Sequence, residues 1–360
     1  MINPSLARVW RDATTIQIGL DPTRAVVLGG LTALEATVLR GLDGRSDMFM
    51  LRSLAIDQGG DASATDRLLE VLRAAGVLVD YDRLPPASRP DPAAEPDDDG
   101  HDLAADPVHL RAPDQAALGL LTGAPDGGAA AMQARREAWV EVRGAGRVGS
   151  QVARLLDAAG IGQVTAVDSL STSPADLTPG GLGARQVGRP RGEATERLIT
   201  DTPAPDTASS RRPAVTDPAA PDVVVLAPQP EAARVGGGDV LVAARIPHVA
   251  ARIVELSGIV GPFVIPGNTC CLRCLDLHRS DRDPAWARVV AQAQHRRAEV
   301  AACDVTLATQ VAALAAQQVL AHLDGFSPAS VDGTIEIALP YGLARRRSWR
   351  PHPACGCTWS

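Results

Sequence analysis

The sequence predicts an α/β protein with a largely parallel sheet, preceded by a small α+β domain. Residues 139–168 read as strand, glycine turn, helix and strand, and further strand and helix patterns follow up to residue 339. This alternation is typical of a parallel sheet covered by helices. Residues 1–84 instead contain a hairpin pattern followed by three helix patterns. The 360 residues are enough for two or three domains.

Residues 1–84 are expected to fold as a separate winged-helix domain. Alternating side chains in Thr15–Leu20 and Ala25–Leu28, joined by a turn, predict a hairpin. Val77–Val79 reads as a last strand. The three helix patterns begin near Thr32, Met48 and Ser63. Domains of this layout bind DNA or peptides, and a purely structural appendage is the alternative, because a fold does not fix a function.

Residues 85–106 differ sharply in composition from both neighbours. They are rich in proline, alanine and aspartate and contain almost no bulky apolar side chain. Such a segment cannot bury enough surface to order itself, so we expect an acidic flexible linker. The second domain then covers residues 107–360 and begins with the apolar stretch His109–Leu121 and a helix at Ala129–Glu137.

The glycine turn of this domain has the form G-x-G-x-x-G, with Gly144, Gly146 and Gly149. The first glycine permits the tight turn, the second lets a phosphate approach the backbone, and the third lets helix and strand pack closely. Asp168 ends the next strand, at about the distance of a ribose-binding carboxylate. The pattern predicts a Rossmann-like nucleotide site, and a tight packing turn without a ligand is the alternative.

The patterns after Asp168 are weaker. Glu193–Ile199 reads as a short helix, and residues 200–221 read as a Pro-, Ala- and Thr-rich insert. Asp222–Leu226 is the continuous apolar run expected of a buried parallel strand. A well-buried helix is expected at Asp304–His322. Further strands are expected at Val240–Ala244, Phe263–Ile265 and Thr334–Leu339.

Two close cysteine pairs predict a metal centre. Cys271 and Cys274 form C-x-x-C, and Cys355 and Cys357 form C-x-C near the C-terminus. Four thiolates from two short turns make a closed tetrahedral Zn²⁺ site, which has no open position for catalysis. Unmetallated thiols in a reducing compartment are the alternative.

Other side chains near these pairs have weaker claims to the metal. Cys270 could replace Cys271, although C-x-x-C is the commoner spacing. His278 and His352 are rival ligands by position, with a solvent-facing or supporting role favoured for each. Cys303 precedes a helix, where the dipole could lower a thiol pKa, but a buried small residue is the favoured interpretation.

Charge and apolar patterning exclude several classes of protein. The net charge of −7 argues against a general nucleic-acid binder. No apolar run is long enough to span a bilayer, and the first residues lack the features of a signal peptide, so we expect a cytoplasmic protein without a membrane partner. The chain contains no lysine, which excludes a Schiff-base or phosphate-loop lysine.

Four blocks of the second domain point to a family. They are the glycine block ending at Asp168, G-R-P-R-G-E-A at 188–194, P-G-N-T-C-C-L-R-C at 266–274, and the final cysteine pair. Together they resemble the ThiF/MoeB/HesA group of ubiquitin-activating-enzyme-like adenylyltransferases over about residues 130–360. The resemblance implies a Rossmann-like, ThiF-type NAD/FAD-binding fold, ATP and Mg²⁺ binding, adenylation of a C-terminal carboxylate, and a structural zinc held by two cysteine pairs.

The resemblance also implies roles for single residues. The glycines and Asp168 match the family's nucleotide motif and ribose carboxylate. G-R-P-R resembles the family's G-x-P-K, which places Arg191 at the phosphate-binding lysine. Arg185 with Gln186 resembles its Arg-Gln pair. In the family, an Asn-Leu pair precedes this Arg-Gln pair. Counted from Asp168, however, Asp176 and Leu177 fit that Asn-Leu pair better, and Pro179 then stands where the Arg should be.

Three departures from the family pattern bear on ATP chemistry. Leu170 stands where a second Asp is usual, and the strand that should end in a metal-binding Asp reads V-V-V-L-A-P-Q-P. Arg191 replaces a lysine, and the two are not equivalent at a phosphate site. Losing the metal carboxylate removes charge stabilisation that adenylyl transfer needs. The sequence thus predicts a retained fold with degenerate ATP chemistry.

The N-terminal pattern, with T-I-Q-I-G-L-D-P at 15–22, is similar to a peptide-recognition element. That element precedes a ThiF-like domain in the partner proteins of azoline-forming cyclodehydratases. The resemblance implies binding of a precursor's leader peptide for a cyclodehydratase-like enzyme, with a homodimer as one expected assembly. The peptide would add to the strand edge in Thr15–Leu20 or Ala25–Leu28, beside a groove wall at Leu68–Leu72.

Two other functions compete with this interpretation. One is an active adenylyltransferase for a sulfur-carrier or ubiquitin-like carrier protein. The other is a nicotinamide-dependent oxidoreductase, against which the cysteine pairs argue. DNA binding by the N-terminal domain is disfavoured, because the third helix carries only two arginines. The negative charges of Asp61, Asp66 and Glu70 offset these two arginines.

Overall fold

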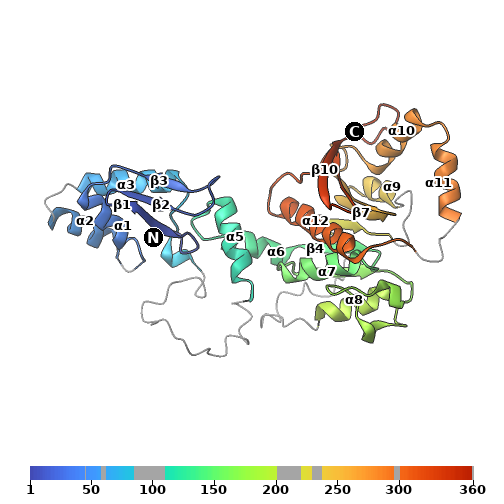
Figure 1. The fold of residues 1–360 in the computed structure, drawn as a ribbon, viewed down its shortest axis with the longest axis horizontal. Helices are drawn as coiled ribbons and strands as arrows, with labels where there is room; N and C mark the ends of the chain where they lie inside the picture. Colours follow the sequence, from blue (N-terminus) through green and yellow to red (C-terminus); the bar gives the residue numbers. More distant parts are fainter. Residues whose placement is uncertain are drawn as a thin grey trace. The chain divides into compact units, whose positions relative to one another are not determined.

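A computed structural model describes residues 1–44, 46–57, 62–84, 110–200, 220–228, 237–295 and 301–358. The chain forms two compact units, Met1–Gln133 and Ala134–Ser360 (Figure 1). The expected linker at 85–106 lies outside the described residues, as does most of the expected insert at 200–221. None of the described helices combines the length and the apolarity that crossing a membrane requires.

The division between the units falls later in the chain than the expected domain start at residue 107. Helix α5 (Ala112–Thr122) belongs to the first unit. The Arg24 guanidinium donates a hydrogen bond to the Leu120 carbonyl over 2.9 Å, which ties α5 to the N-terminal fold. Helix α6 (Ala129–Glu137), found where the sequence places it, leads into the second unit.

Before α5, the described residues of the first unit form a three-stranded antiparallel sheet with helices α1, α2 and α3. Strand β2 (Thr15–Ile18) pairs with β3 (Val26–Leu28), which confirms the predicted hairpin, and also with β1 (Arg8–Asp12), which the sequence did not indicate. Strand β2 is therefore central, and β1 and β3 are the edges. The helices are α1 (Ala33–Gly41), α2 (Met48–Asp57) and α3 (Ala62–Ala74), close to the expected positions.

Two details of this unit correct the sequence analysis. The strand expected at Val77–Val79 is wrong, because Leu78 forms only an isolated bridge with Ile2. The expected groove wall is wrong in most of its residues, since Leu68, Leu69 and Leu72 are buried in the core. The predicted start of α1 is confirmed, because the Thr32 hydroxyl accepts the Glu35 N–H and the two residues form a capping box.

The two faces of the β1-β2-β3 sheet differ in character. Ile16 and Ile18 are buried in the core of the unit. The intervening Gln17 pairs with Val9 on one side and Val27 on the other, so these three residues form a row on the opposite face. Val9 and Val27 are 43% and 46% exposed. Apolar side chains thus stand on the outer face of both edge strands.

The second unit contains a seven-stranded sheet in the order β10-β9-β8-β7-β6-β4-β5. Strands β5, β4, β6 and β7 are parallel, and β8, β9 and β10 continue the sheet in antiparallel fashion. The sheet therefore agrees with the predicted α/β class. The bounds are β4 (Trp139–Arg143), β5 (Gln163–Val167), β6 (Val223–Leu226), β7 (His248–Val254), β8 (Ser257–Val264), β9 (Gly333–Ala338) and β10 (Leu343–Ser348).

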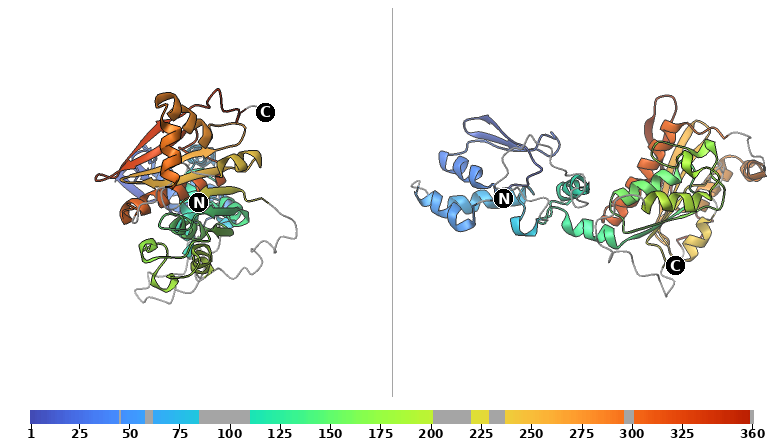
Figure 2. Two further views of the ribbon diagram at one scale, coloured as in Figure 1. Left: turned by 90° about the vertical axis from the view of Figure 1, so that its right-hand side faces the viewer. Right: turned by 90° about the horizontal axis from the view of Figure 1, so that it is seen from below.

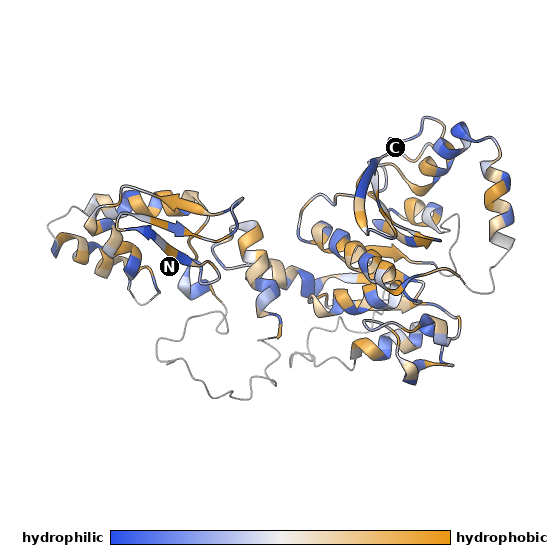
Figure 3. Ribbon diagram, in the orientation of Figure 1, coloured by the Kyte–Doolittle hydropathy of each residue, from blue (hydrophilic) through white to orange (hydrophobic). Residues whose placement is uncertain are grey.

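Helices lie on both faces of this sheet (Figure 2). On one face, α7 and α12 bury their apolar side chains against β4, β6 and β7. On the other face, Leu241 of α9 and Leu272 of α10 pack on Leu226 and Ala250. Apolar residues are concentrated in the central strands, whereas β10 is hydrophilic (Figure 3). The helix bounds are α7 (Gly149–Ala158), α8 (Arg191–Thr200), α9 (Gly238–Ala243), α10 (Leu272–Arg282), α11 (Trp286–His295) and α12 (Val305–Leu323).

The strand expected at Val240–Ala244 is wrong, because α9 ends at Ala243 and Ala244 is its C-cap. Gly237 adopts a left-handed backbone, with φ 85°, just before the helix begins. Leu241 is buried while Val240 is exposed, which is the pattern of one buried helical face. An apolar run this short does not distinguish a strand from a buried helix.

Candidate nucleotide turn and metal centre

The glycine turn lies between β4 and α7, at the carboxyl end of the parallel strands. Gly144 adopts φ 95°, and a Cβ built there would lie 2.1 Å from the Ala227 carbonyl oxygen. A Cβ on Gly149 would lie 1.8 Å from the Gly144 carbonyl oxygen. The Gly146 carbonyl accepts the Ser150 N–H over 3.1 Å and its hydroxyl over 2.7 Å. The packing of the turn therefore requires the first and third glycines before any ligand is considered.

Gly149→Ala is expected to lower the free energy of unfolding by about 3 kcal/mol, because its Cβ has no room beside the Gly144 carbonyl. Denaturant unfolding measures the effect. Gly183→Ala is the matched control, since its φ is −114° and its Cβ would meet only the end of the Gln186 side chain at 3.3 Å. Equal stability of the two variants would contradict this account of the turn.

Asp168 follows β5 and bonds to the backbone of its own chain. Its Oδ2 accepts the Ala145 N–H over 2.8 Å, and its Oδ1 accepts the Leu170 N–H over 2.9 Å. The side chain is 7% exposed. Asp168 thus connects the end of β5 directly to the glycine turn, and both carboxylate oxygens are already engaged.

Arg191 lies beside Asp168 but is held mainly by a second carboxylate, Asp176. Its Nε and Nη2 donate to Asp176 Oδ2 over 3.0 and 2.9 Å, and Nη2 is 2.7 Å from Oδ1. Its Nη1 is 3.8 Å from Asp168 Oδ2. The Ser173 N–H and hydroxyl donate to Asp176 Oδ2 over 2.7 and 2.8 Å. Two nearly buried carboxylates therefore already neutralise the guanidinium charge.

Arg185 stands apart from this network. It lies in the short 3₁₀ turn Ala184–Gln186 and is exposed. Within the described part of the chain, its side chain makes no hydrogen bond or ion pair. The structure thus brings together the glycine turn, Asp168 and Arg191, and leaves Arg185 outside.

Strand β6 ends without an acidic side chain at the edge where a metal carboxylate would be needed. Leu226 and Ala227 there are buried. Asp222 is the only carboxylate in the described residues 220–228, and it stands at the opposite end of the strand, where its Oδ2 accepts the Trp139 N–H over 2.7 Å. This part of the chain therefore offers no carboxylate for Mg²⁺ beside the glycine turn.

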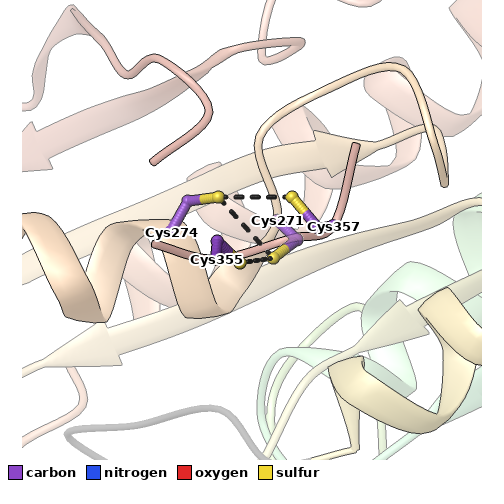
Figure 4. Close-up of side chains that lie close together, drawn as sticks. All are labelled: Cys271, Cys274, Cys355 and Cys357. Atoms are coloured by element: carbon purple, nitrogen blue, oxygen red, sulfur yellow. Dashed lines mark hydrogen bonds between the residues drawn. The ribbon is translucent and has the colours of Figure 1, made fainter. Parts of the chain in front are cut away.

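The two cysteine pairs meet at one point (Figure 4). Cys271 is the N-cap of α10, and Cys274 lies in its first turn. The Sγ atoms of Cys271 and Cys355 are 3.4 Å apart, as are those of Cys274 and Cys357, and those of Cys271 and Cys274 are 3.8 Å apart. All four Sγ atoms lie within 4.8 Å of one another. These four residues could therefore hold one metal ion.

The crowding of the thiols controls their ionisation. The Cys271 thiol donates to Cys274 Sγ, which lowers the pKa of Cys274 to about 4. The same hydrogen bond, together with burial, raises the pKa of Cys271 far above its ordinary value. Burial raises the pKa of Cys357 to about 12. Protein groups alone thus favour only one thiolate among these three, whereas a divalent cation would stabilise all of them.

The donor set fits Zn²⁺, which takes four sulfur ligands in closed structural sites. The His352 N–H also donates to Cys274 Sγ over 3.3 Å. Backbone donors of this kind orient and stabilise a metal-bound thiolate. Trp349 is buried in the cluster that surrounds the four cysteines.

Neither rival histidine is part of the cysteine cluster. His278, Asp281 and His352 form a separate group of possible ligands. The Ala354 N–H donates to His352 Nδ1 over 3.1 Å, so Nε2 carries the proton that it shares with Asp281 Oδ2 over 2.9 Å. His278 Nε2 bonds to the Arg350 carbonyl over 2.9 Å. These hydrogen bonds fasten the C-terminal segment to α10.

The other two cysteines also lie outside the cluster. Cys270 is buried, its N–H donates to Asp332 Oδ1 over 2.7 Å, and burial strongly raises its pKa. Cys303 packs against the core between α7, α12 and the sheet. Sequence reasoning missed Asp332, whose carbonyl also accepts the Trp349 N–H over 2.9 Å. Asp332 thus holds the backbone of Cys270 and Trp349 beside the cysteine cluster, and an isolated Asp in a loop carries no sequence signal for such a contact.

Comparisons with known proteins bear on the fold and the family. No curated protein sequence matches the chain. Among solved structures, Escherichia coli MccB with ATP gives a TM-score of 0.66 at 14% identity, over 99% of this chain and 98% of that chain. The microcin C7 biosynthetic enzyme MccB in complex with N-formylated MccA gives 0.66 at 14% identity, over 99% of both chains. PaaA gives 0.62 at 14% identity, over 96% of this chain and 99% of that chain.

Similarity at this level of identity concerns the fold alone. The family assignment rests instead on a match of residues 121–358 to the model of the ThiF family. That match includes the glycine turn, the Asp168–Arg191 contacts and all four clustered cysteines. Because it spans more than half of the chain, this protein belongs to the ThiF family.

Proposed function

We propose that this ThiF-family protein binds the leader peptide of a ribosomally made, modified peptide and presents it to a cyclodehydratase-like partner enzyme. In this proposal the first unit is a winged-helix peptide-recognition domain, and the second unit docks the enzyme. The ATP chemistry of the family is degenerate here, and zinc is structural. A homodimer in the cytoplasm is compatible with this role.

The open edge of the first sheet carries the proposal. Strand β3 pairs only with β2 in the described structure, so one side of its backbone is available to an extended peptide. Val27 stands exposed on this strand, and Val71 of α3 is 51% exposed. Because β2 is central, Ala25–Leu28 is the proposed site and Thr15–Leu20 is not. MccB, which has a similar fold, has been solved in complex with MccA.

The contacts around Asp168 support the degenerate nucleotide site. A phosphate would have to compete with Asp168 and Asp176 for the Arg191 guanidinium. A ribose hydroxyl would have to share the Asp168 oxygens with two backbone N–H groups. Breaking an ion pair between nearly buried side chains costs several kcal/mol of free energy. MccB has been solved with ATP, so the fold accommodates a nucleotide and the argument rests on the residues of this chain.

Peptide binding by the full-length protein tests the proposal. A fluorescein-labelled leader peptide of the precursor encoded nearest this gene is expected to bind saturably in an anisotropy titration without ATP. Duplex DNA is expected not to bind, because Arg67 and Arg73 of α3 offer too few phosphate contacts. Salt-sensitive DNA binding without peptide binding would overturn the proposal.

Nucleotide binding separates this role from that of an adenylyltransferase. Calorimetric titration with ATP and Mg²⁺ is expected to show only weak binding, and ATP–pyrophosphate exchange is expected to be absent with or without the peptide. The physical reason is the engaged Arg191 and the missing carboxylate at the end of β6. Tight binding with exchange stimulated by a carrier protein would instead favour an active adenylyltransferase.

A further inference from the structure

Strand β10 is one of the two edge strands of the seven-stranded sheet, and all six of its residues are exposed. It pairs with β9 on one side, and no described strand pairs with its other side. Edge strands of this kind present unpaired N–H and C=O groups to any extended chain. The hydrophilic colour of β10 in Figure 3 reflects three successive arginines, Arg345, Arg346 and Arg347.

These arginines divide between the two faces of the strand. Arg346 is engaged, because its guanidinium donates to the carbonyls of Ala329 and Val331 over 2.7 and 2.9 Å. Arg345 and Arg347 are on the other face, with Leu343. They share one carboxylate, Glu336 of β9, at 3.0 and 3.8 Å. Two exposed guanidinium groups thus depend on a single carboxylate.

More arginines approach this face from other elements. Arg252 of β7 is in the same cross-strand row as Glu336 and Arg345, through Ile259 of β8. From α10, Arg279 and Arg282 place their guanidinium groups 5.9 and 5.4 Å from the Trp349 ring centre. Arg347 lies over the same ring at 4.7 Å.

The grouping of these cations is electrostatically costly. Burial, and next the charge of Arg279, lower the pKa of Arg252 to about 10. Burial also lowers the pKa of Arg279, and Arg347 and Arg282 lower it further. Asp276 opposes the lowering of both pKa values, and Glu336 opposes that of Arg279. Arg345 and Arg347, which are 77% and 44% exposed, thus form a positive surface on a chain whose net charge is −7, and this surface complements an anionic partner.

We propose that β10 is a docking strand for an extended acidic segment of a protein partner, which adds to the sheet beside Leu343, Arg345 and Arg347. This site goes beyond leader-peptide binding at β3, because it belongs to the unit Ala134–Ser360. Main-chain hydrogen bonds supply affinity in such strand addition, and alternate side chains supply specificity. A second copy of the chain does not fit, because pairing β10 with itself would bring the arginines of both copies together.

The side-chain order on β10 defines the sequence that it should prefer. The antiparallel partner of Arg347, Arg345 and Leu343 reads Glu-x-Glu-x-Leu, with an acidic residue opposite each arginine. The register of β9 provides the precedent, since Glu336 stands directly opposite Arg345. A segment on the outer edge would therefore give Arg345 a carboxylate on both sides.

Peptide titration of the full-length protein tests the proposal. The probe is a labelled peptide Thr-Glu-Thr-Glu-Thr-Leu-Thr, and its partner probe carries lysines in place of both glutamates. We expect the acidic probe to bind, to slow hydrogen exchange of the β10 amides, and to weaken as the salt concentration rises. The R345Q/R347Q double variant should bind it about tenfold more weakly. The R154Q/R288Q variant removes the same charge from α7 and α11 and should bind normally.

Any of four results would overturn the proposal. The first is equal binding of the acidic and lysine probes. The second is an unchanged affinity in the R345Q/R347Q variant. The third is displacement of the probe by inorganic triphosphate without protection of the β10 amides, which would indicate a simple anion site. If the wild-type protein binds neither probe, the arginines serve only to keep the edges of neighbouring molecules apart, and the docking strand is excluded.

Discussion

Cys274→Ala is expected to abolish stoichiometric zinc binding and to lower the free energy of unfolding of the second unit by on the order of 5 kcal/mol. Cys274 has the most contacts in the cluster, since its Sγ approaches those of Cys271 and Cys357 and accepts the His352 N–H. The remaining three thiols cannot complete a closed tetrahedral site. Metal analysis of freshly purified protein and thermal unfolding measure the two effects.

Cys303→Ala and Cys270→Ala provide the controls, because neither residue belongs to the cluster of four. Both variants should keep about one zinc per chain. A chelator added to the wild-type protein should reproduce the instability of Cys274→Ala and leave that variant unchanged. Zinc retained in Cys274→Ala, or lost from Cys270→Ala, would show that the ligand set is wrong.

Val27→Asp is expected to weaken leader-peptide binding by at least about tenfold, which corresponds to about 1.4 kcal/mol. The exposed Val27 side chain lies on edge strand β3, where an added peptide strand would pack beside it. A carboxylate at this position would be desolvated without a partner. Fluorescence anisotropy with the leader peptide, on the full-length variant, measures the loss.

Val9→Asp is a closely matched control for this variant. Val9 has the same side chain, nearly the same exposed fraction, and a place in the same cross-strand row, but it lies on the opposite edge strand β1. The Val9→Asp variant should bind the peptide with the affinity of the wild-type protein. A loss of binding in Val9→Asp alone would move the peptide to β1, and normal binding by both variants would remove the first sheet from the proposed function.

The features that the sequence predicted depend on local spacing. A side chain at Gly149 would collide with the Gly144 carbonyl, and one at Gly144 would collide with the Ala227 carbonyl at the end of β6. The spacing of the glycines therefore identifies the turn. The cysteine pairs are each confined to one short turn, and their meeting agrees with the preference of four thiols for one metal. The ThiF-type resemblance and the α/β class rest on these same blocks.

The features that the sequence missed depend on contacts formed only by folding. The resemblance places Arg191 at a phosphate, whereas its contact with Asp176 arises only when loop 168–176 brings that carboxylate to the guanidinium. Strand β10 has no apolar alternation because both of its faces are exposed at the sheet edge. The helix at Gly238–Ala243 was read as a strand because a short apolar run suits either element. The winged-helix identity of the first unit stays a prediction.

The position of the cysteine pairs along the chain has a consequence for chain entropy. Cys271 and Cys355 are 84 residues apart, and the segment between them contains α10, α11, α12, β9 and β10. A metal that joins the two pairs would close a loop of this length in the unfolded chain as well as in the folded one. By the loop-closure relation used for cross-links, that restriction is worth about 4–5 kcal/mol. A metal that stayed bound to both pairs during unfolding would therefore stabilise the β9–β10 edge of the sheet by limiting the freedom of the unfolded chain.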